Sequence, residues 1–244
     1  MSDTDEQIHR HWDAEAETYD TTIDHQPQTD LEWAIWTDVL ARRLPTAPCR
    51  ILDVGAGTGF LSLIAARLGH EVTALDFSAN MLSILSDKAR DEGLSISLVE
   101  ARADQLPNET WDAVISRHLL WTLPDPLAAL KSWRAAVPSG QMVLIDWSEA
   151  LCHPLSARVL SRHLIWHAQR RLKLAKEPIS SDLRSKLPLF GGTSPERIMS
   201  LIVKAGWRAP RLERLPDVDW IMSRQLPRLG RLIGVPPRYL VWAD

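Results

Sequence analysis

A short apolar strand that runs directly into a glycine-rich turn constrains this chain more than any other feature. The predicted strand 50–54 is followed by the turn Asp53-Val54-Gly55-Ala56-Gly57-Thr58-Gly59 and by a predicted helix over 60–68. Glycines permit a sharp turn and the close approach of a ligand. The free N–H groups at the start of the next helix suit a negatively charged group. The turn therefore predicts a ligand site at the carboxyl edge of a parallel sheet.

Strands and helices alternate on both sides of this turn. Strands are predicted over 50–54, 71–75, 95–99, 111–116, 140–146, 208–214 and 239–243, and helices over 4–19, 30–44, 60–68, 78–92, 126–136, 154–175 and 194–206. This spacing is typical of an α/β fold, in which a mostly parallel sheet carries helices on both faces.

Composition excludes several classes of protein. The 244 residues carry a formal net charge of -3, which argues against a nucleic-acid partner. Two isolated cysteines, Cys49 and Cys152, make neither a disulfide framework nor a metal site. The chain has no apolar run of the ~18 residues that a membrane span needs, and its first ten residues do not resemble a signal peptide. We expect a cytoplasmic protein with no membrane partner, as a monomer or a homodimer.

Two acidic residues indicate which ligand the turn binds. Asp53 precedes the first glycine, where it would repel a pyrophosphate and favour an ammonium group. Asp76 ends the second strand, where a carboxylate can accept hydrogen bonds from both hydroxyls of a ribose. A nicotinamide dehydrogenase would need a third glycine where Phe60 stands. A cofactor with an amine and a ribose but no phosphate is S-adenosylmethionine (SAM), whose product after methyl transfer is S-adenosylhomocysteine.

An ordered set of further motifs strengthens this prediction. The motifs are Ile51-Leu52-Asp53-Val54-Gly55-Ala56-Gly57-Thr58-Gly59, Ala74-Leu75-Asp76-Phe77-Ser78, Ala103-Asp104-Gln105-Leu106-Pro107, Trp111-Asp112-Ala113-Val114-Ile115-Ser116, Leu123-Pro124-Asp125-Pro126 and Gly140-Gln141-Met142-Val143-Leu144-Ile145-Asp146. With them the chain resembles the class I SAM-dependent methyltransferase family. The resemblance implies a Rossmann-like seven-stranded sheet of order 3-2-1-4-5-7-6 with an antiparallel last strand. It also divides the single domain 1–244 into a helical lid (1–44), a SAM-binding core (45–150), a helical insertion over the substrate (151–193) and the end of the core (194–244).

The resemblance also implies the residues that hold the cofactor. They are Tyr19, Asp53, Gly55, Gly57, Thr58, Asp76, Phe77, Met81, Ala103, Asp104, Ser116 and Arg117. Asp53 and the backbone at Gly55 are expected to hold the methionine part, and Asp76 the ribose. Arg117 is expected near the methionine carboxylate or the substrate. One position departs from the family, because Arg102 stands where many relatives have an acid, and Asp104 is expected to take over the contact with adenine.

The acceptor site is less determined by the sequence. Residues expected to contact the acceptor are Trp12, His118, Trp121, Trp147 and Trp166, and those expected to position the reacting groups are His118, Trp121 and Tyr19. Trp33 and Trp36 are further candidates for an aromatic wall. His163 and His167 lie four residues apart without a third ligand, so a polar helix surface is favoured over a metal site. No acid–base pair is evident.

One stretch suggests what the acceptor is. The run Ser116-Arg117-His118-Leu119-Leu120-Trp121-Thr122-Leu123-Pro124-Asp125-Pro126 is similar to a subgroup of bacterial natural-product enzymes that includes N-methyltransferases of antibiotics and of heterocyclic toxins such as toxoflavin. A small-molecule acceptor methylated on a nitrogen of an aromatic heterocycle is therefore expected. The alternatives are O- or C-methylation of a small metabolite, a SAM-binding protein without catalysis, and, less favoured, an RNA methyltransferase.

Overall fold

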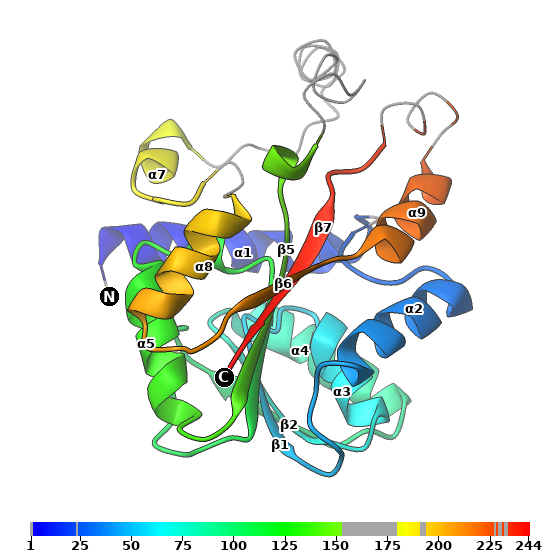
Figure 1. The fold of residues 1–244 in the computed structure, drawn as a ribbon, viewed down its shortest axis with the longest axis horizontal. Helices are drawn as coiled ribbons and strands as arrows, with labels where there is room; N and C mark the ends of the chain where they lie inside the picture. Colours follow the sequence, from blue (N-terminus) through cyan, green and yellow to red (C-terminus); the bar gives the residue numbers. More distant parts are fainter. Residues whose placement is uncertain are drawn as a thin grey trace.

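Seven short strands pair into one sheet, in the order β3-β2-β1-β4-β5-β7-β6, in the computed structural model of the chain (Figure 1). The strands are β1 (Arg50–Val54), β2 (Glu71–Asp76), β3 (Ile96–Glu100), β4 (Ala113–Arg117), β5 (Gln141–Trp147), β6 (Arg211–Arg214) and β7 (Arg238–Ala243). β1 to β5 run parallel, whereas β7 runs antiparallel to both of its neighbours, β5 and β6. The predicted strand order and the antiparallel last strand are confirmed.

The structure describes residues 2–22, 24–152, 180–190, 194–226, 228, 231 and 234–244. The helix predicted over 154–175, with Trp166 and the histidine pair His163 and His167, lies outside the described residues.

Six of the helices in the described residues lie at predicted places, whereas α7 (Ser181–Ser185) and α9 (Pro216–Gln225) were not predicted. The six predicted helices are α1 (Asp3–Tyr19), α2 (Asp30–Ala41), α3 (Phe60–Arg67), α4 (Ala79–Asp91), α5 (Pro126–Ala136) and α8 (Pro195–Lys204), and the chain also has short 3-10 turns η1 (Leu120–Thr122) and η2 (Glu149–Leu151). Side-chain caps mark several starts: Ser78 Oγ accepts the Met81 N–H of α4 at 3.2 Å, and Asp125 accepts the Ala128 N–H of α5 at 2.9 Å. Such caps satisfy N–H groups that have no partner within the helix.

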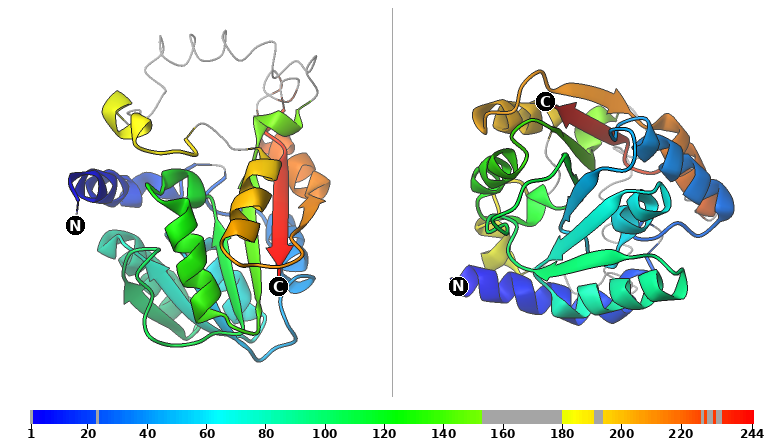
Figure 2. Two further views of the ribbon diagram at one scale, coloured as in Figure 1. Left: turned by 60° about the vertical axis from the view of Figure 1, so that its left-hand side comes forward. Right: turned by 90° about the horizontal axis from the view of Figure 1, so that it is seen from below.

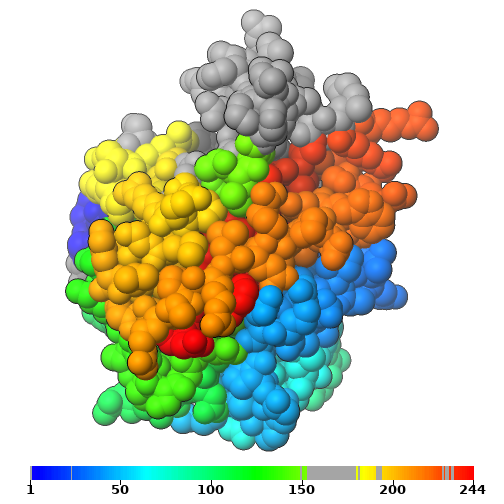
Figure 3. Space-filling model, in the orientation of Figure 1, coloured from blue at the N-terminus to red at the C-terminus, as the bar shows by residue number. Residues whose placement is uncertain are grey.

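Residues along the central strands alternate between two apolar cores. Leu52 faces the core that α5 and α8 complete with Trp133 and Ile202. Its neighbour Ile51 faces the opposite core, which α2, α3 and α9 complete. Two views show these helix groups on opposite sides of the sheet (Figures 1 and 2). The space-filling view shows α8, β6 and α9 spread between α5 and α2 (Figure 3). The predicted helices on both faces are thus confirmed.

The first helix lies apart from both layers. α1 packs against α4 and α7, and its Ile8 joins Leu183 and Leu187 in a small apolar cluster. The Ser78 hydroxyl donates to the Asp13 carboxylate at 2.5 Å, which joins α1 to the start of α4. α1 is therefore attached to the turn that follows β2.

Three features of the fold differ from the sequence prediction, and the first is the short helix α7, which was not expected. α9 was not expected, although Pro216 at its start and the acids Asp217 and Asp219 in its first turn are typical of a helix N-terminus. The predicted strand 208–214 is paired only over Arg211–Arg214. Among the described residues, no helix is both long and apolar enough to cross a membrane.

Candidate functional site

The glycine turn after β1 is held in a conformation that side chains disfavour. Gly55, Gly57 and Gly59 have φ values of 71°, 54° and 96°, in the left-handed region. The N–H of Gly55 donates to the Leu75 carbonyl at 2.8 Å, which joins the turn to β2. A Cβ at Gly55 would lie 2.8 Å from Leu119. Glycine is therefore required at Gly55 by both backbone conformation and packing.

Asp76 ends β2 beside this turn. Its Oδ2 accepts the N–H of Gly57 at 2.8 Å, and its Oδ1 accepts the N–H of Ser78 at 2.9 Å. Burial raises the pKa of the Asp76 carboxyl, while those two N–H groups lower it. A carboxylate has about four acceptor positions, so it can accept a further hydrogen bond beside these.

A cavity opens where the turn, Asp76 and α1 meet. It holds about 900 Å³ of empty space, including its opening to solvent. The residues predicted from sequence that line it are Trp12, Tyr19, Gly55, Gly57, Asp76, Phe77, Met81, Ala103, Asp104, Arg117 and His118. The fold thus brings together, around one cavity, side chains from α1, from the ends of β2 and β4 and from the loop after β3.

Three predicted cofactor residues lie behind the cavity instead of lining it. Asp53 is only 1% exposed and accepts the Ser62 hydroxyl at 2.6 Å, and burial raises its pKa to about 7. The Thr58 hydroxyl donates to Asp20 at 2.6 Å, and the Ser116 hydroxyl donates to the Val54 carbonyl at 2.8 Å. In the structure these side chains hold the turn in place, and the expected contact of Asp53 with the ligand stays a prediction.

Arg102 joins α1 to the loop after β3. Its guanidinium pairs with Asp5 of α1, and it donates to Asp104 through Nε at 2.9 Å and Nη2 at 3.1 Å. Arg102 and Asp5 both line the cavity and were not predicted as site residues. Asp104 was expected to contact adenine, and both of its oxygens accept from Arg102. The arginine at position 102, where many relatives have an acid, was a sequence signal for the Arg102–Asp104 contact. The pairing of Arg102 with Asp5 of α1 had no signal in the sequence.

The tryptophans separate into cavity and core residues. Trp12 lines the cavity, and its ring lies 6.0 Å from the ring of Trp121, which stands behind it. Trp36 is 1% exposed and packs on Phe60 within the α2–α3 core, so its expected place in an aromatic wall is wrong. Trp33 lies under the Arg67 guanidinium, 3.9 Å from it, and is likewise away from the cavity. Whether Trp33 and Trp36 face the cavity or the core depends on which face of α2 is buried. The sequence alone did not identify that face.

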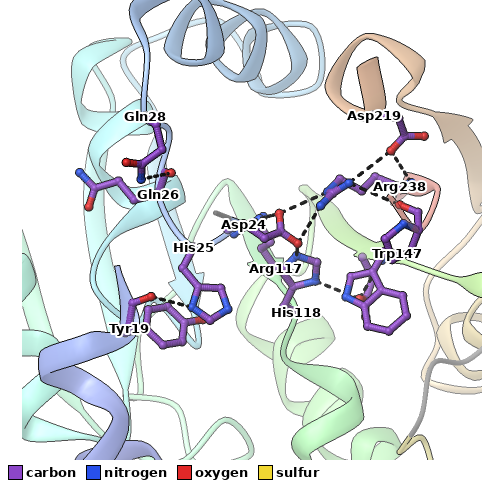
Figure 4. Close-up of polar contacts among 12 residues, drawn as sticks. Tyr19, Asp24, His25, Gln26, Gln28, Arg117, His118, Trp147, Asp219 and Arg238 are labelled. Atoms are coloured by element: carbon purple, nitrogen blue, oxygen red, sulfur yellow. Dashed lines mark hydrogen bonds and ion pairs between the residues drawn. The ribbon is translucent and has the colours of Figure 1, made fainter. Parts of the chain in front are cut away.

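The α1–α2 link, residues 20–29, brings His25 against Tyr19, which lines the cavity (Figure 4). The ring of His25 stacks on Tyr19 with centroids 3.8 Å apart, and its Nδ1 contacts the Tyr19 carbonyl at 2.8 Å. Burial raises the pKa of Tyr19 to about 12 and lowers that of His25 to about 4. Both rings are therefore uncharged near neutral pH. A Cβ added at Gly57 would lie 3.8 Å from the Tyr19 ring, which places that ring against the glycine turn.

Asp24 of this link enters a buried group of charges. Its carboxylate lies 2.8 Å from Arg117 Nη2, 2.9 Å from Arg238 Nη2 and 3.4 Å from His118 Nε2 (Figure 4). Burial alone would raise the pKa of Asp24, but the two guanidinium groups outweigh it and hold that pKa well below its usual value. Arg117, which was expected near the cofactor carboxylate, is here the partner of Asp24.

His118 and Asp146 form a contact that sequence reasoning missed. His118 Nδ1 lies 3.0 Å from Asp146 Oδ1, which also accepts the Trp147 N–H at 2.8 Å. The two residues follow or end the adjacent parallel strands β4 and β5. Carboxyl ends of neighbouring parallel strands meet at one edge, so the strand order alone could have indicated this pair. Trp147 is not among the described residues that line the cavity.

The central part of the chain is similar to known methyltransferases. Residues 52–145 match the model of a methyltransferase domain family. The ubiquinone/menaquinone biosynthesis C-methyltransferase UbiE of Vibrio parahaemolyticus is 34% identical over 116 residues, which cover 44% of this chain and 44% of that protein. A ubiquinone biosynthesis O-methyltransferase of Xanthomonas oryzae is 36% identical over 115 residues, covering 44% of this chain and 46% of its own. The match thus spans less than half the length of these relatives.

Solved structures resemble the chain over nearly its whole length. The DhpI–SAM–HEP complex has a TM-score of 0.60 at 20% identity and covers 98% of this chain and 96% of its own. The [4+2]-cyclase SpnF has a TM-score of 0.66 at 16% identity, with the same coverage of 98% and 96%. At these identities the likeness establishes the shared fold.

Proposed function

We propose that this chain belongs to the class I SAM-dependent methyltransferase family, binds SAM in the cavity beside α1 and transfers its methyl group to a small-molecule acceptor. The observation that carries the proposal is the junction of the left-handed glycine turn with the Asp76 carboxylate at one wall of the cavity. The turn brings backbone close to a ligand, and Asp76 supplies two acceptors for a diol.

The residues present fit SAM. Asp76 would hold the ribose hydroxyls through the lone pairs that Gly57 and Ser78 leave unused. Phe77 and Met81 line the cavity next to Asp76 and would pack on the apolar face of the adenosine. Tyr19 covers the glycine turn and would shield the methionine part from solvent. SAM, when bound, supplies a methyl group carried on a positively charged sulfur.

The chain's own contribution is positioning and exclusion of water. Methyl displacement requires the acceptor atom in line with the methyl carbon, and orientation of this kind can provide much of the rate enhancement. α1 borders the cavity and brings Trp12 and Tyr19 to it, and His25 of the α1–α2 link stacks on Tyr19. A closed apolar roof also strengthens the electrostatic interactions beneath it.

The acceptor is proposed to be flat and aromatic, as expected for a nitrogen heterocycle. Trp12 and Tyr19 line the cavity with their rings 6.2 Å apart, and such faces suit stacking of a planar ring. The relatives include a C-methyltransferase and an O-methyltransferase, so carbon and oxygen acceptors are the alternatives to nitrogen. A SAM-binding protein without turnover is the alternative outside enzymes.

Two linked measurements test this proposal. The full chain is titrated by calorimetry with SAM, S-adenosylhomocysteine, adenosine and NAD. We expect SAM and S-adenosylhomocysteine to bind and NAD not to bind. Methyl-labelled SAM is then incubated with a panel of phenols and aromatic heterocycles, and mass spectrometry locates the label. Absence of SAM binding would overturn the proposal, whereas SAM binding with no labelled product from any metabolite extract would favour the non-catalytic alternative.

A further inference from the structure

The ammonium group of Lys88, a residue of α4, joins the α1–α2 link to the glycine turn. Its Nζ lies 2.5 Å from the Asp20 carboxylate and 2.7 Å from the side-chain oxygen of Gln26, both on the link. The same Nζ lies 3.1 Å from the Thr58 carbonyl, on the turn. An ammonium group has three N–H donors, so each of these three acceptors can take one.

On the link, Lys88 contacts the two residues that come next to a pair of stacked rings. Asp20 follows Tyr19 in the chain, and Gln26 follows His25. The rings of Tyr19 and His25 stack with centroids 3.8 Å apart, and His25 Nδ1 contacts the Tyr19 carbonyl at 2.8 Å (Figure 4). One ammonium group thus holds both ends of the segment that forms this stack.

On the glycine turn, Lys88 contacts the residue next to the one that Tyr19 covers. Thr58 follows Gly57, and a Cβ added at Gly57 would lie 3.8 Å from the Tyr19 ring. The Thr58 hydroxyl also donates to the Asp20 carboxylate at 2.6 Å. Asp20 therefore accepts from both the turn and α4, and these contacts hold the link and the turn together.

These polar contacts lie beside the cavity and not in its wall. Among the described residues, those that line the cavity include Tyr19 and Gly57 but not Lys88, Asp20 or Thr58. The side chains of Lys88 and Asp20 are 21% and 28% exposed, so their ion pair is partly protected from screening by salt. An effect of Lys88 on a ligand in the cavity must therefore pass through the residues that it holds.

Resting on the proposed function, we infer that Lys88 is a positioning residue for the cofactor, because its ammonium group holds the Tyr19 ring against the glycine turn. The ring and the turn then form one wall of the site through contacts of the protein itself. Ordering a loop upon binding costs free energy, and a wall that is already held in place reduces that cost. Without Lys88, the link can move away from the turn, and SAM has to order it.

Calorimetry with S-adenosylhomocysteine tests this inference without any acceptor. Lys88→Met keeps a side chain of similar length and removes the three donors. We expect this variant to bind about 10-fold more weakly than the wild type, because charged hydrogen bonds that order the site are lost. Hydrogen exchange in residues 20–29 should be faster in the free variant than in the free wild type. Unchanged affinity in a folded variant would overturn the inference, and so would unchanged exchange.

Removal of Tyr19 shows whether Lys88 acts through that ring. Tyr19→Ala should weaken binding by itself, and Lys88→Met should cause no further loss in the Tyr19→Ala background, because the ring that it positions is gone. Tyr19→Ala with wild-type affinity, or the same loss from Lys88→Met in both backgrounds, would overturn the inference and leave the proposed function standing. A wild type that binds neither SAM nor S-adenosylhomocysteine would instead overturn the proposed function.

Arg90→Met is the matched control on the same helix. Arg90 pairs with Asp87 at 2.6 Å, both side chains are exposed, and neither residue is among the described residues that line the cavity. This variant should keep the wild-type affinity, and a loss equal to that in Lys88→Met would overturn the inference.

Asp20→Asn replaces Lys88→Met in the same cycle if thermal melting shows that Lys88→Met is unfolded. Asparagine can still accept the Thr58 hydroxyl, but it removes the negative charge that faces Lys88. It should weaken binding when Tyr19 is present and have no effect in Tyr19→Ala. Unchanged affinity in Asp20→Asn would then overturn the inference.

Discussion

The carboxylate of Asp24 lies 2.9 Å from the guanidinium of Arg238, although 214 positions separate the two residues in the chain. Asp24 belongs to the link between α1 and α2, and Arg238 begins β7. Arg238 also pairs with Asp219 of α9 at 3.4 Å, and Asp24 also pairs with Arg117. The N-terminal segment is thus joined to the last strand by a buried group of charges beside the cavity.

Asp24→Asn should destabilise the folded chain by about 3 kcal/mol, the lower end of the range for a broken buried ion pair. The variant leaves Arg117 buried without a carboxylate, whereas Arg238 keeps Asp219. Because the pKa of Asp24 lies well below its ordinary 3.8 in the fold, its stabilisation is present above that value and is lost as pH falls below it. Urea unfolding of both proteins measures this difference across pH.

A surface carboxylate provides the control for that variant. Asp38→Asn removes an exposed i,i+4 pair with Arg42 and should cost no more than about 0.5 kcal/mol. Hydrogen exchange in the α1–α2 link should accelerate in Asp24→Asn and not in Asp38→Asn. Equal stability of the two variants would show that Asp24 does not anchor the link.

His25→Phe should reduce the dependence of stability on pH. Burial lowers the pKa of His25 to about 4 from 6.5, so the unfolded chain binds a proton between these values that the folded chain does not. The stability of the wild type therefore falls as pH drops from 6.5 to about 4. Phenylalanine keeps the stack on Tyr19 without a titrating group. Unfolding free energies across this range should show a shallower decline in the variant, and parallel curves would contradict the assignment.

Asp53→Asn should gain stability relative to the wild type as pH rises. Burial raises the pKa of Asp53 to about 7 from 3.8, so the folded chain retains a proton that the unfolded chain has released. Stability from this group is present below 3.8 and is lost as pH rises through about 7. Asparagine can still accept the Ser62 hydroxyl and never ionises. A stability difference that stays constant from acid to neutral pH would show that Asp53 is not a buried titrating group.

Much of the fold was predictable because its signals are local. The apolar run 50–54 before Gly55 gave β1 with its observed bounds, and Asp125-Pro126 gave the start of α5. Strand order came from the family resemblance, since pairing between distant strands leaves no local mark. α9 was missed although Pro216 marks its start, and unlike α8 it has no side-chain cap at its N-cap residue.

The cofactor side of the site was predictable to a similar degree, and the acceptor side was not. Asp76 and Phe77 line the cavity because they end a strand at the edge where ligands lie. The contacts of Asp24 with Arg238 and of His118 with Asp146 join separate elements. Neither pair has a spacing that marks it in the sequence. Strand order could have indicated the His118–Asp146 pair, because both residues lie at the carboxyl ends of adjacent strands, whereas the Asp24–Arg238 pair comes only from the three-dimensional arrangement.

Titration of SAM into the wild type and into Asp76→Ala, followed by calorimetry, tests the central claim most directly. We predict saturable binding at one site and a loss of about 1–3 kcal/mol, about 5- to 150-fold in Kd, in the variant, because two ribose hydroxyls lose a charged acceptor. Asp87→Ala, which removes an exposed carboxylate of α4, is the control, and thermal melting verifies that each variant is folded. Folded Asp76→Ala with unchanged affinity, or a wild type that does not bind SAM, would contradict the account.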